Sequence, residues 1–191
     1  MDVYDKIIRI IDVNIIYCLF PLTLAIILIE TGFKNRFQTK KIFNLIRWVI
    51  ITYTLITLSY YLYGLIFLPD RYAIIQRATG PYRMVYWLML FCSTLLPLSL
   101  IFKKLAKKRW YILLVCMFIK IGAFFEIFVI TVTSFHRDYL VDGHNYDWWN
   151  SPFVSILLIF LQGFLLALLV LGAFEFAEKV KIRNSSVEKD V

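Results

Sequence analysis

Five apolar blocks, each about as long as a membrane-spanning helix, constrain what this chain can fold into. They lie at about residues 13–29, 48–68, 84–102, 110–135 and 153–176. A bilayer core of roughly 30 Å needs about 20 apolar residues in a helix, because backbone polar groups must be hydrogen-bonded within the segment. Continuous apolarity without strict alternation favours helices over an outer-membrane barrel. We therefore predict an all-α, multi-pass membrane bundle of about five transmembrane helices.

Composition supports this class. Hydrophobic residues make up 61% of the 191 residues, and the mean hydropathy is +0.73, which is too apolar for a single soluble core. We assign residues 1–178 to the bundle and residues 179–191 to a cytoplasmic tail, in which the polar run "KIRNSSVEKDV" is expected to be disordered. Cys18, Cys92 and Cys116 all fall in predicted spans without metal-ligand spacing, so we expect small buried hydrophobes and no disulfide.

Basic residues cluster on alternate connections and orient the bundle. The connections after the first, third and fifth blocks carry Lys34, Arg36, Lys40, Lys41, Arg47, Lys103, Lys104, Lys107, Lys108, Arg109, Lys179, Lys181, Arg183 and Lys189. The opposite side carries only Lys6, Arg9, Arg71, Arg77, Arg83 and Arg137. Because Lys and Arg are retained in the cytoplasm, we predict an inner (cytoplasmic) membrane protein with its amino terminus outside and its carboxyl terminus inside. The net charge of +8 is then explained by topology and lipid headgroups, so we expect the lipid bilayer and not nucleic acid as a partner.

Two charged residues, Lys120 and Glu126, lie near the middle of the fourth block. A charge at the bilayer centre costs several kcal/mol, so such residues usually face the bundle interior and often mark ion, proton or substrate paths. Helical geometry places the two about 120° apart, which predicts separate partners. The structural alternatives are interhelical packing for either residue and, for Lys120, extension toward the cytoplasmic headgroups. The Glu126 side chain is shorter than that of Lys120 and extends less far toward the headgroups, so we predict Glu126 as the functional residue.

The outward half of the same block suggests a proton path. Glu126, Thr133 and Arg137 lie on one helical stripe that leads to the outer loop, where His136 is also found. Loss of hydration favours the protonated form of a carboxylate, which suits Glu126 for exchanging a proton with a quinol or a water chain. The alternative is that a tyrosine or arginine of another helix holds Glu126 without proton movement.

Other chemical motifs are absent from the sequence. His136 and His144 are its only histidines and match no metal-site spacing, so we interpret them as loop or interface residues and predict no metal site. The sequence contains no nucleophile triad, phosphate loop or dinucleotide fingerprint. These observations favour a non-catalytic or accessory subunit of a larger complex.

Two runs carry a family resemblance. The run "GPYRMVYWLMLFCSTLLPLSLIFKKL", followed by "FFEIFVITVTSFHRDYL", resembles the later helices of the polysulfide-reductase-type (NrfD-like) membrane subunit family, which includes the membrane subunits of alternative complex III. In that family a Gly-Pro turn enters a helix with an interior proline, matched here by Gly80, Pro81 and Pro97. The following helix carries a glutamate, here Glu126, and ends in an outer turn similar to residues 136–138.

This resemblance covers about residues 53–178 and implies a function. Ile127 stands where the family pattern has an arginine, and the predicted helices are fewer than in family members. The resemblance implies an anchor, quinol-pocket or proton-path subunit of a respiratory quinone-linked oxidoreductase, whose partner subunits carry haem or iron-sulfur clusters. This chain alone is expected to bind no cofactor, and a quinone is expected at an interface shared with another membrane subunit.

Two other classes stay open. The chain could be a non-catalytic scaffold or assembly subunit of another envelope machine, such as a secretion or transport assembly, in which the intramembrane charges dock against a partner helix. A free-standing transporter is the third class, which five spans without an internal repeat do not favour. In the first two classes, other membrane protein subunits are the expected partners.

Overall fold

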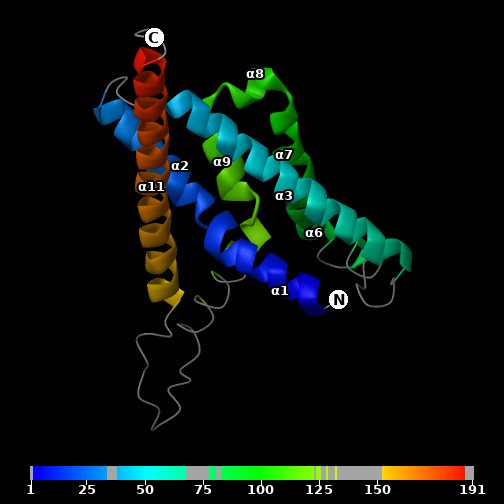
Figure 1. Cartoon of the computed structure of the whole chain (residues 1–191). Helices are drawn as coiled ribbons and strands as arrows, with labels where there is room; N and C mark the ends of the chain where they lie inside the picture. The colour runs from blue at the N-terminus through cyan, green and yellow to red at the C-terminus, as the bar shows by residue number, and fades with distance from the viewer. Residues whose placement is uncertain are drawn as a thin grey trace, which may run out of the picture. The chain divides into compact units, whose positions relative to one another are not determined.

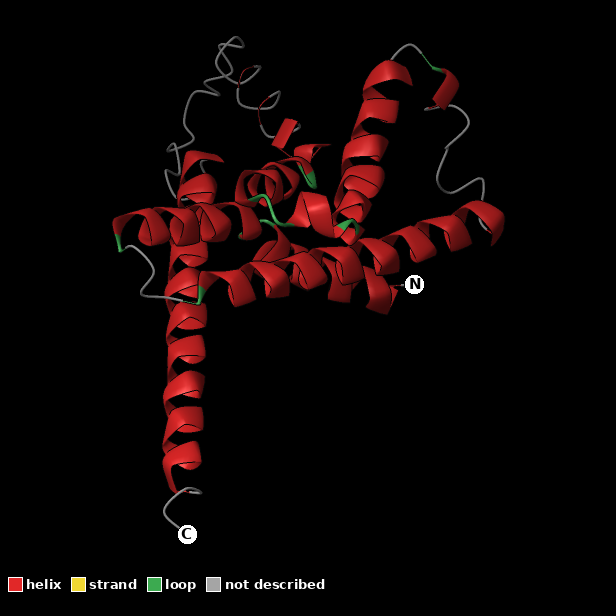
Figure 2. Ribbon diagram, turned by 90° about the horizontal axis from the view of Figure 1, so that it is seen from above, coloured by secondary structure: helices red, strands yellow, loops and turns green. Residues whose placement is uncertain are grey.

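The computed structural model of the chain describes residues 2–33, 38–67, 78–80, 83–122, 124–125, 128, 132 and 152–187. These residues form helices and turns, with no strand among them (Figure 2). Four of the described helical stretches are long and apolar enough to cross a membrane: Lys6–Gly32, Thr39–Phe67, Arg83–Ile101 and Val154–Val180. The predicted all-α, multi-pass membrane fold is therefore confirmed.

The first and last spans are longer than predicted. The first consists of helix α1 (Asp2–Ile11), a π-helical turn η1 (Asp12–Ile16) and helix α2 (Leu19–Gly32), so it begins well before residue 13 (Figure 1). The last, α11 (Pro152–Val187), continues into the tail, and the expected disorder is wrong for residues 181–187. Extending an existing helix costs much less than nucleating one, which is why these polar residues remain helical.

The two middle spans differ in regularity. Helix α3 (Thr39–Phe67) is continuous and covers residues 48–67 of the predicted block 48–68. The third span is assembled from α6 (Arg83–Leu90), the π-helical turn η2 (Phe91–Leu95), α7 (Leu96–Leu98) and the 3-10 turn η3 (Ser99–Ile101). The short helix α8 (Lys103–Ala106) then leads to α9 (Arg109–Phe118).

Prolines account for the irregular turns. A proline lacks the backbone N–H, and its ring clashes with the carbonyl four residues earlier. The η1 turn shortly precedes Pro21, and η2 precedes Pro97. At the end of η1 the Tyr17 N–H donates to the Asp12 carbonyl at 2.9 Å, which is the five-residue spacing of a π-helix. Each π-helical turn therefore accommodates a proline without ending the span.

The fourth predicted block, 110–135, is described only in part. Helix α9 covers its beginning, a turn occupies residues 119–120, and residues 121–122, 124–125, 128 and 132 are helical. The Phe124 N–H donates to the Lys120 carbonyl at 3.2 Å, so helical hydrogen bonding resumes after the turn. A complete fifth span stays a prediction, because most of residues 126–151 lie outside the described residues.

The chain divides into two compact units, Met1–Ile46 with Leu157–Val191, and Arg47–Ile156. In the first unit α11 contacts the first span at Gly163, where an added Cβ would overlap the Pro21 ring and the Cys18 carbonyl oxygen. Phe20 and Phe160 also meet edge to face there, with ring centroids 6.1 Å apart. A glycine is needed at this crossing because only its absent side chain permits so close an approach.

The second unit contains most of α3, the third span and α9. Its interior is formed by Ile50, Tyr53, Thr54, Cys92, Leu100, Ile112, Val115 and Cys116. All three cysteines are buried and none is in a disulfide, as predicted.

Candidate functional site

Lys120 is the predicted site residue that the structure describes. It lies in the turn after α9, half-buried, and its Nζ is 5.2 Å from the centroid of the Tyr53 ring on α3. Tyr53 is buried, with 8% of its surface exposed. A cation over an aromatic face is attracted by the ring quadrupole, by about 2 kcal/mol where water is excluded. Lys120 thus makes an interhelical packing contact, which is one of the alternatives considered for it.

The backbone beside Lys120 lies close to the third span. An added Cβ at Gly122 would overlap the terminal methyl group of Met89 on α6. The segment after α9 therefore contacts α3 through Lys120 and α6 through Gly122. Three helical elements of the second unit meet around Lys120.

Arg47 makes a second polar contact, at the end of the third span. Its Nε donates to the Leu100 carbonyl at 2.8 Å, and its Nη2 donates to the Ile101 carbonyl at 3.1 Å. The last carbonyls of a helix have no partner within it and carry partial negative charge. Arg47 of α3 therefore caps the carboxyl end of η3. The sequence identified Arg47 only as a topology signal, because nothing in its own neighbourhood indicates a capping role.

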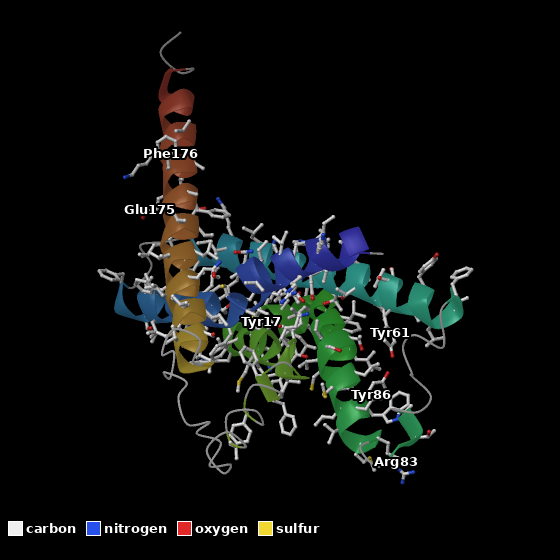
Figure 3. The ribbon with its side chains drawn as sticks, turned by 90° about the horizontal axis from the view of Figure 1, so that it is seen from below. Tyr17, Tyr61, Arg83, Tyr86, Glu175 and Phe176 are labelled. Atoms are coloured by element: carbon white, nitrogen blue, oxygen red, sulfur yellow. The ribbon has the colours of Figure 1, made fainter. Side chains whose placement is uncertain are left out.

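Two hydroxyl pairs complete the connections within this unit. The Ser99 hydroxyl of η3 lies 2.5 Å from the Tyr111 hydroxyl of α9. The Tyr61 hydroxyl of α3 lies 2.5 Å from the Tyr86 hydroxyl of α6. Figure 3 shows Tyr61 and Tyr86 approaching one another from the two helices. The partners are 12 residues apart in the first pair and 25 in the second, and each pair joins two different helical elements.

The contacts of Arg47, Tyr53 and Tyr61 occur at successive levels along α3. At 1.5 Å per residue, Tyr53 lies about 9 Å from Arg47 along the helix, and Tyr61 about 12 Å further. We call the set the polar ladder; its members are Arg47, Tyr53, Tyr61, Tyr86, Ser99, Tyr111 and Lys120. Hydrogen bonds between transmembrane helices contribute about 0.6 kcal/mol on average. The ladder is therefore suited to fixing the register of three helical elements.

The opposite side of α3 is exposed within the structure. Trp48, Leu55 and Tyr63 are 54%, 48% and 52% exposed, and Thr52 and Ser59 are exposed as well. At 100° per residue these five positions fall within about 80° of the helix circumference, away from the arc that contains Tyr53 and Tyr61. We call these five residues the exposed α3 face. The sequence analysis missed this face, although its spacing of three and four residues was a readable signal.

The remaining predicted site residues lie outside the described residues. These are Glu126, Thr133, His136 and Arg137 of the proton path, together with His144. The path stays a prediction. In the part of the chain that the structure describes, no cluster of His, Cys, Asp or Glu could hold a metal ion.

Comparison with known proteins leaves the family open. No protein-family model matches the chain, and no curated protein or solved structure matches it. Function is therefore inferred from the polar ladder, the exposed α3 face and the sequence motifs.

Proposed function

We propose that the chain is an integral membrane subunit of a multi-subunit complex and that it serves as an anchor or scaffold for other membrane-spanning chains. The exposed α3 face carries this proposal. Small and hydroxyl-bearing residues on transmembrane helices favour contact with another helix, because they allow close approach and can hydrogen-bond across it. Thr52 and Ser59 lie on this face, seven residues apart, inside a span.

The low burial of the spans supports the same proposal. Only 28% of the apolar window of Thr39–Phe67 and 17% of that of Arg83–Ile101 are buried within the structure. Large parts of both helices are therefore available to lipid or to other chains. The polar ladder meanwhile engages Arg47 and Lys120 in packing. A unit in which these two cations are engaged in internal contacts is well suited to act as a fixed support for partners.

A bulky substitution on the exposed α3 face tests the proposal. Ser59→Trp places a large side chain where close helix approach is expected, whereas Leu169→Trp does so at a position of α11 that is 68% exposed. In native membranes solubilised with a mild detergent, we expect the chain to migrate well above its 22.7 kDa mass and Ser59→Trp to reduce that species. The Leu169→Trp control should leave it unchanged.

Two results would contradict the proposal. One is a wild-type chain that migrates as a stable monomer. The other is a photo-crosslinker at Ser59 that reacts only with lipid or with another span of the same chain. Far-ultraviolet circular dichroism of each variant confirms that the helices are retained, so a loss of assembly cannot be attributed to unfolding.

A more specific role is supported by the features that carry the family resemblance. The Arg83 N–H donates to the Gly80 carbonyl at 3.1 Å in the turn that leads into α6, and the same span contains the buried Pro97. We propose on this basis a subunit of a respiratory quinone-linked oxidoreductase of the inner membrane. It would contribute an anchor, a wall of a shared quinol pocket or the proton path from Glu126 to Arg137.

Spectroscopy of the purified complex separates this role from a scaffold in a secretion or transport assembly. Haem absorbance and extractable quinone are expected for the respiratory role, and a colourless, quinone-free complex contradicts it. Glu126→Gln then tests the proton path, because it keeps the shape of the side chain while abolishing titration. Normal assembly with reduced quinone-linked turnover is expected, whereas full turnover at every pH would leave only a packing role for Glu126.

A further inference from the structure

The connection between the third span and α9 is strongly basic. Five of its seven residues from 103 to 109 are cationic: Lys103, Lys104, Lys107, Lys108 and Arg109. All five are exposed, and the segment contains no acidic residue. We call these five residues the basic strip. Such a density of like charge requires an anionic counterpart or open water.

The strip has a defined conformation. Helix α8 forms one turn between two extended residues, Phe102 with ψ 109° and Lys108 with ψ 109°. Within it Leu105 and Ala106 are half-buried, while the lysines on either side are exposed. The Lys107 N–H donates to the Lys103 carbonyl at 3.2 Å, so these two lysines are one helical turn apart and project from the same side. The fold therefore presents the cations together.

Two members of the polar ladder fix the ends of the strip. Before the strip, Arg47 binds the Leu100 and Ile101 carbonyls. After the strip, Tyr111 contacts Ser99, which lies on the other side of the strip in the sequence. These contacts limit the movement of the connection, because residues on both sides belong to packed helices. A preorganised cationic site loses less conformational entropy on binding a ligand than a flexible tail does.

Exposed apolar side chains flank the strip on both sides. Ile101, Phe102 and Trp110 are 52%, 67% and 70% exposed. Tryptophan side chains at the end of a membrane span, such as that of Trp110, are typical of the boundary between hydrocarbon and headgroups. With these three side chains in the boundary region, the adjacent lysines would reach the level of the lipid phosphates. A soluble polyanion would not explain this apolar border.

We propose that the basic strip is a binding site for the phosphate headgroups of anionic phospholipids. Lysine ammonium groups donate charge-assisted hydrogen bonds to phosphate oxygens, and a cation close to an anionic membrane surface strengthens binding by about fivefold. Lys103 and Lys107 provide two adjacent donors on one side of α8. This site goes beyond the proposed subunit role and does not depend on it, since it needs only lipid and this chain.

Competition between lipids in nanodiscs tests the site. The full chain is reconstituted with equal amounts of phosphatidylglycerol and phosphatidylcholine, and the lipids that remain bound are counted by native mass spectrometry. We expect phosphatidylglycerol to be enriched on the wild-type chain. Lys103→Gln combined with Lys104→Gln should reduce that enrichment by about 25-fold, and the corresponding Lys→Arg pair should retain it.

A matched variant shows whether the position or only the charge matters. Lys40→Gln combined with Lys41→Gln also removes two adjacent exposed lysines near the start of a span. We expect this pair to change the enrichment by less than twofold. The proposal is overturned if the wild-type chain shows no preference for phosphatidylglycerol, or if both lysine pairs reduce it equally. Measurement in nanodiscs makes the result independent of membrane topology, because both leaflets contain the same lipids.

Discussion

At the residue scale, the protein uses cations inside or beside the membrane as packing groups. Lys120 lies over the Tyr53 ring, and Arg47 binds two carbonyls at the end of the third span. Both arrangements reduce the cost of removing a cation from water, because an aromatic face or a helix end replaces part of its hydration. Buried hydroxyl groups are also hydrogen-bonded within the protein. Thr23 and Thr54 are fully buried and donate to the carbonyls four residues earlier.

The contribution of the Lys120–Tyr53 contact can be measured with a double-mutant cycle. Tyr53→Leu and Lys120→Gln are made singly and together, and the free energy of unfolding is determined in detergent. We expect a coupling energy of about 1 kcal/mol, because each single change removes the same cation–π contact. Tyr53→Phe retains the aromatic face and should keep most of the coupling. Additive effects of the two changes would show that the contact adds nothing to stability.

At the element scale, the existence of the helices could be predicted but their irregular turns and contacts could not. Apolar length alone located the four long spans. The predicted first span begins after the segment "DVYDKIIRII", whose charges interrupt the apolar run, yet the apolar residues of this segment fall on one side of α1. The capping role of Arg47 and the tyrosine pair depend on which helices are neighbours, and one sequence does not give that information. The predicted proton path lies outside the described residues.

Two glycines of α11 provide an internal comparison at this scale. An added Cβ at Gly163 would overlap Pro21 and the Cys18 carbonyl oxygen, whereas at Gly172 nothing lies within 4 Å. Gly163→Ala should therefore lower the free energy of unfolding by about 1–3 kcal/mol, because a proline ring and a backbone oxygen cannot easily move away. Gly172→Ala should be neutral or slightly stabilising, since alanine favours the helix. Thermal unfolding in one detergent compares the two, and equal effects would contradict the close crossing at Gly163.

At the scale of the whole molecule, the chain consists of two compact units, each of which exposes large apolar side chains. Large apolar side chains such as Ile66, Leu157 and Leu169 are more than 60% exposed, which suits contact with lipid tails. In the described residues, the charges gather near span ends, where headgroups and water are available, with Lys120 inside the fourth block. The predicted topology places residues 103–109 in the cytoplasm, where the basic strip would face the anionic inner leaflet.

Cysteine labelling tests that topology directly. The native Cys18, Cys92 and Cys116 are buried and should react slowly with a membrane-impermeant maleimide, so little background is expected. Lys104→Cys places a thiol at an exposed position of α8, and Asp142→Cys places one in the connection before α11. In intact cells or spheroplasts only the thiol at position 142 should be labelled, and position 104 should react after the membrane is opened. The reverse pattern would place the basic strip outside the cell, away from the retained Lys and Arg residues of the cytoplasmic side. The predicted topology would then be wrong, whereas the nanodisc test of lipid binding would remain valid.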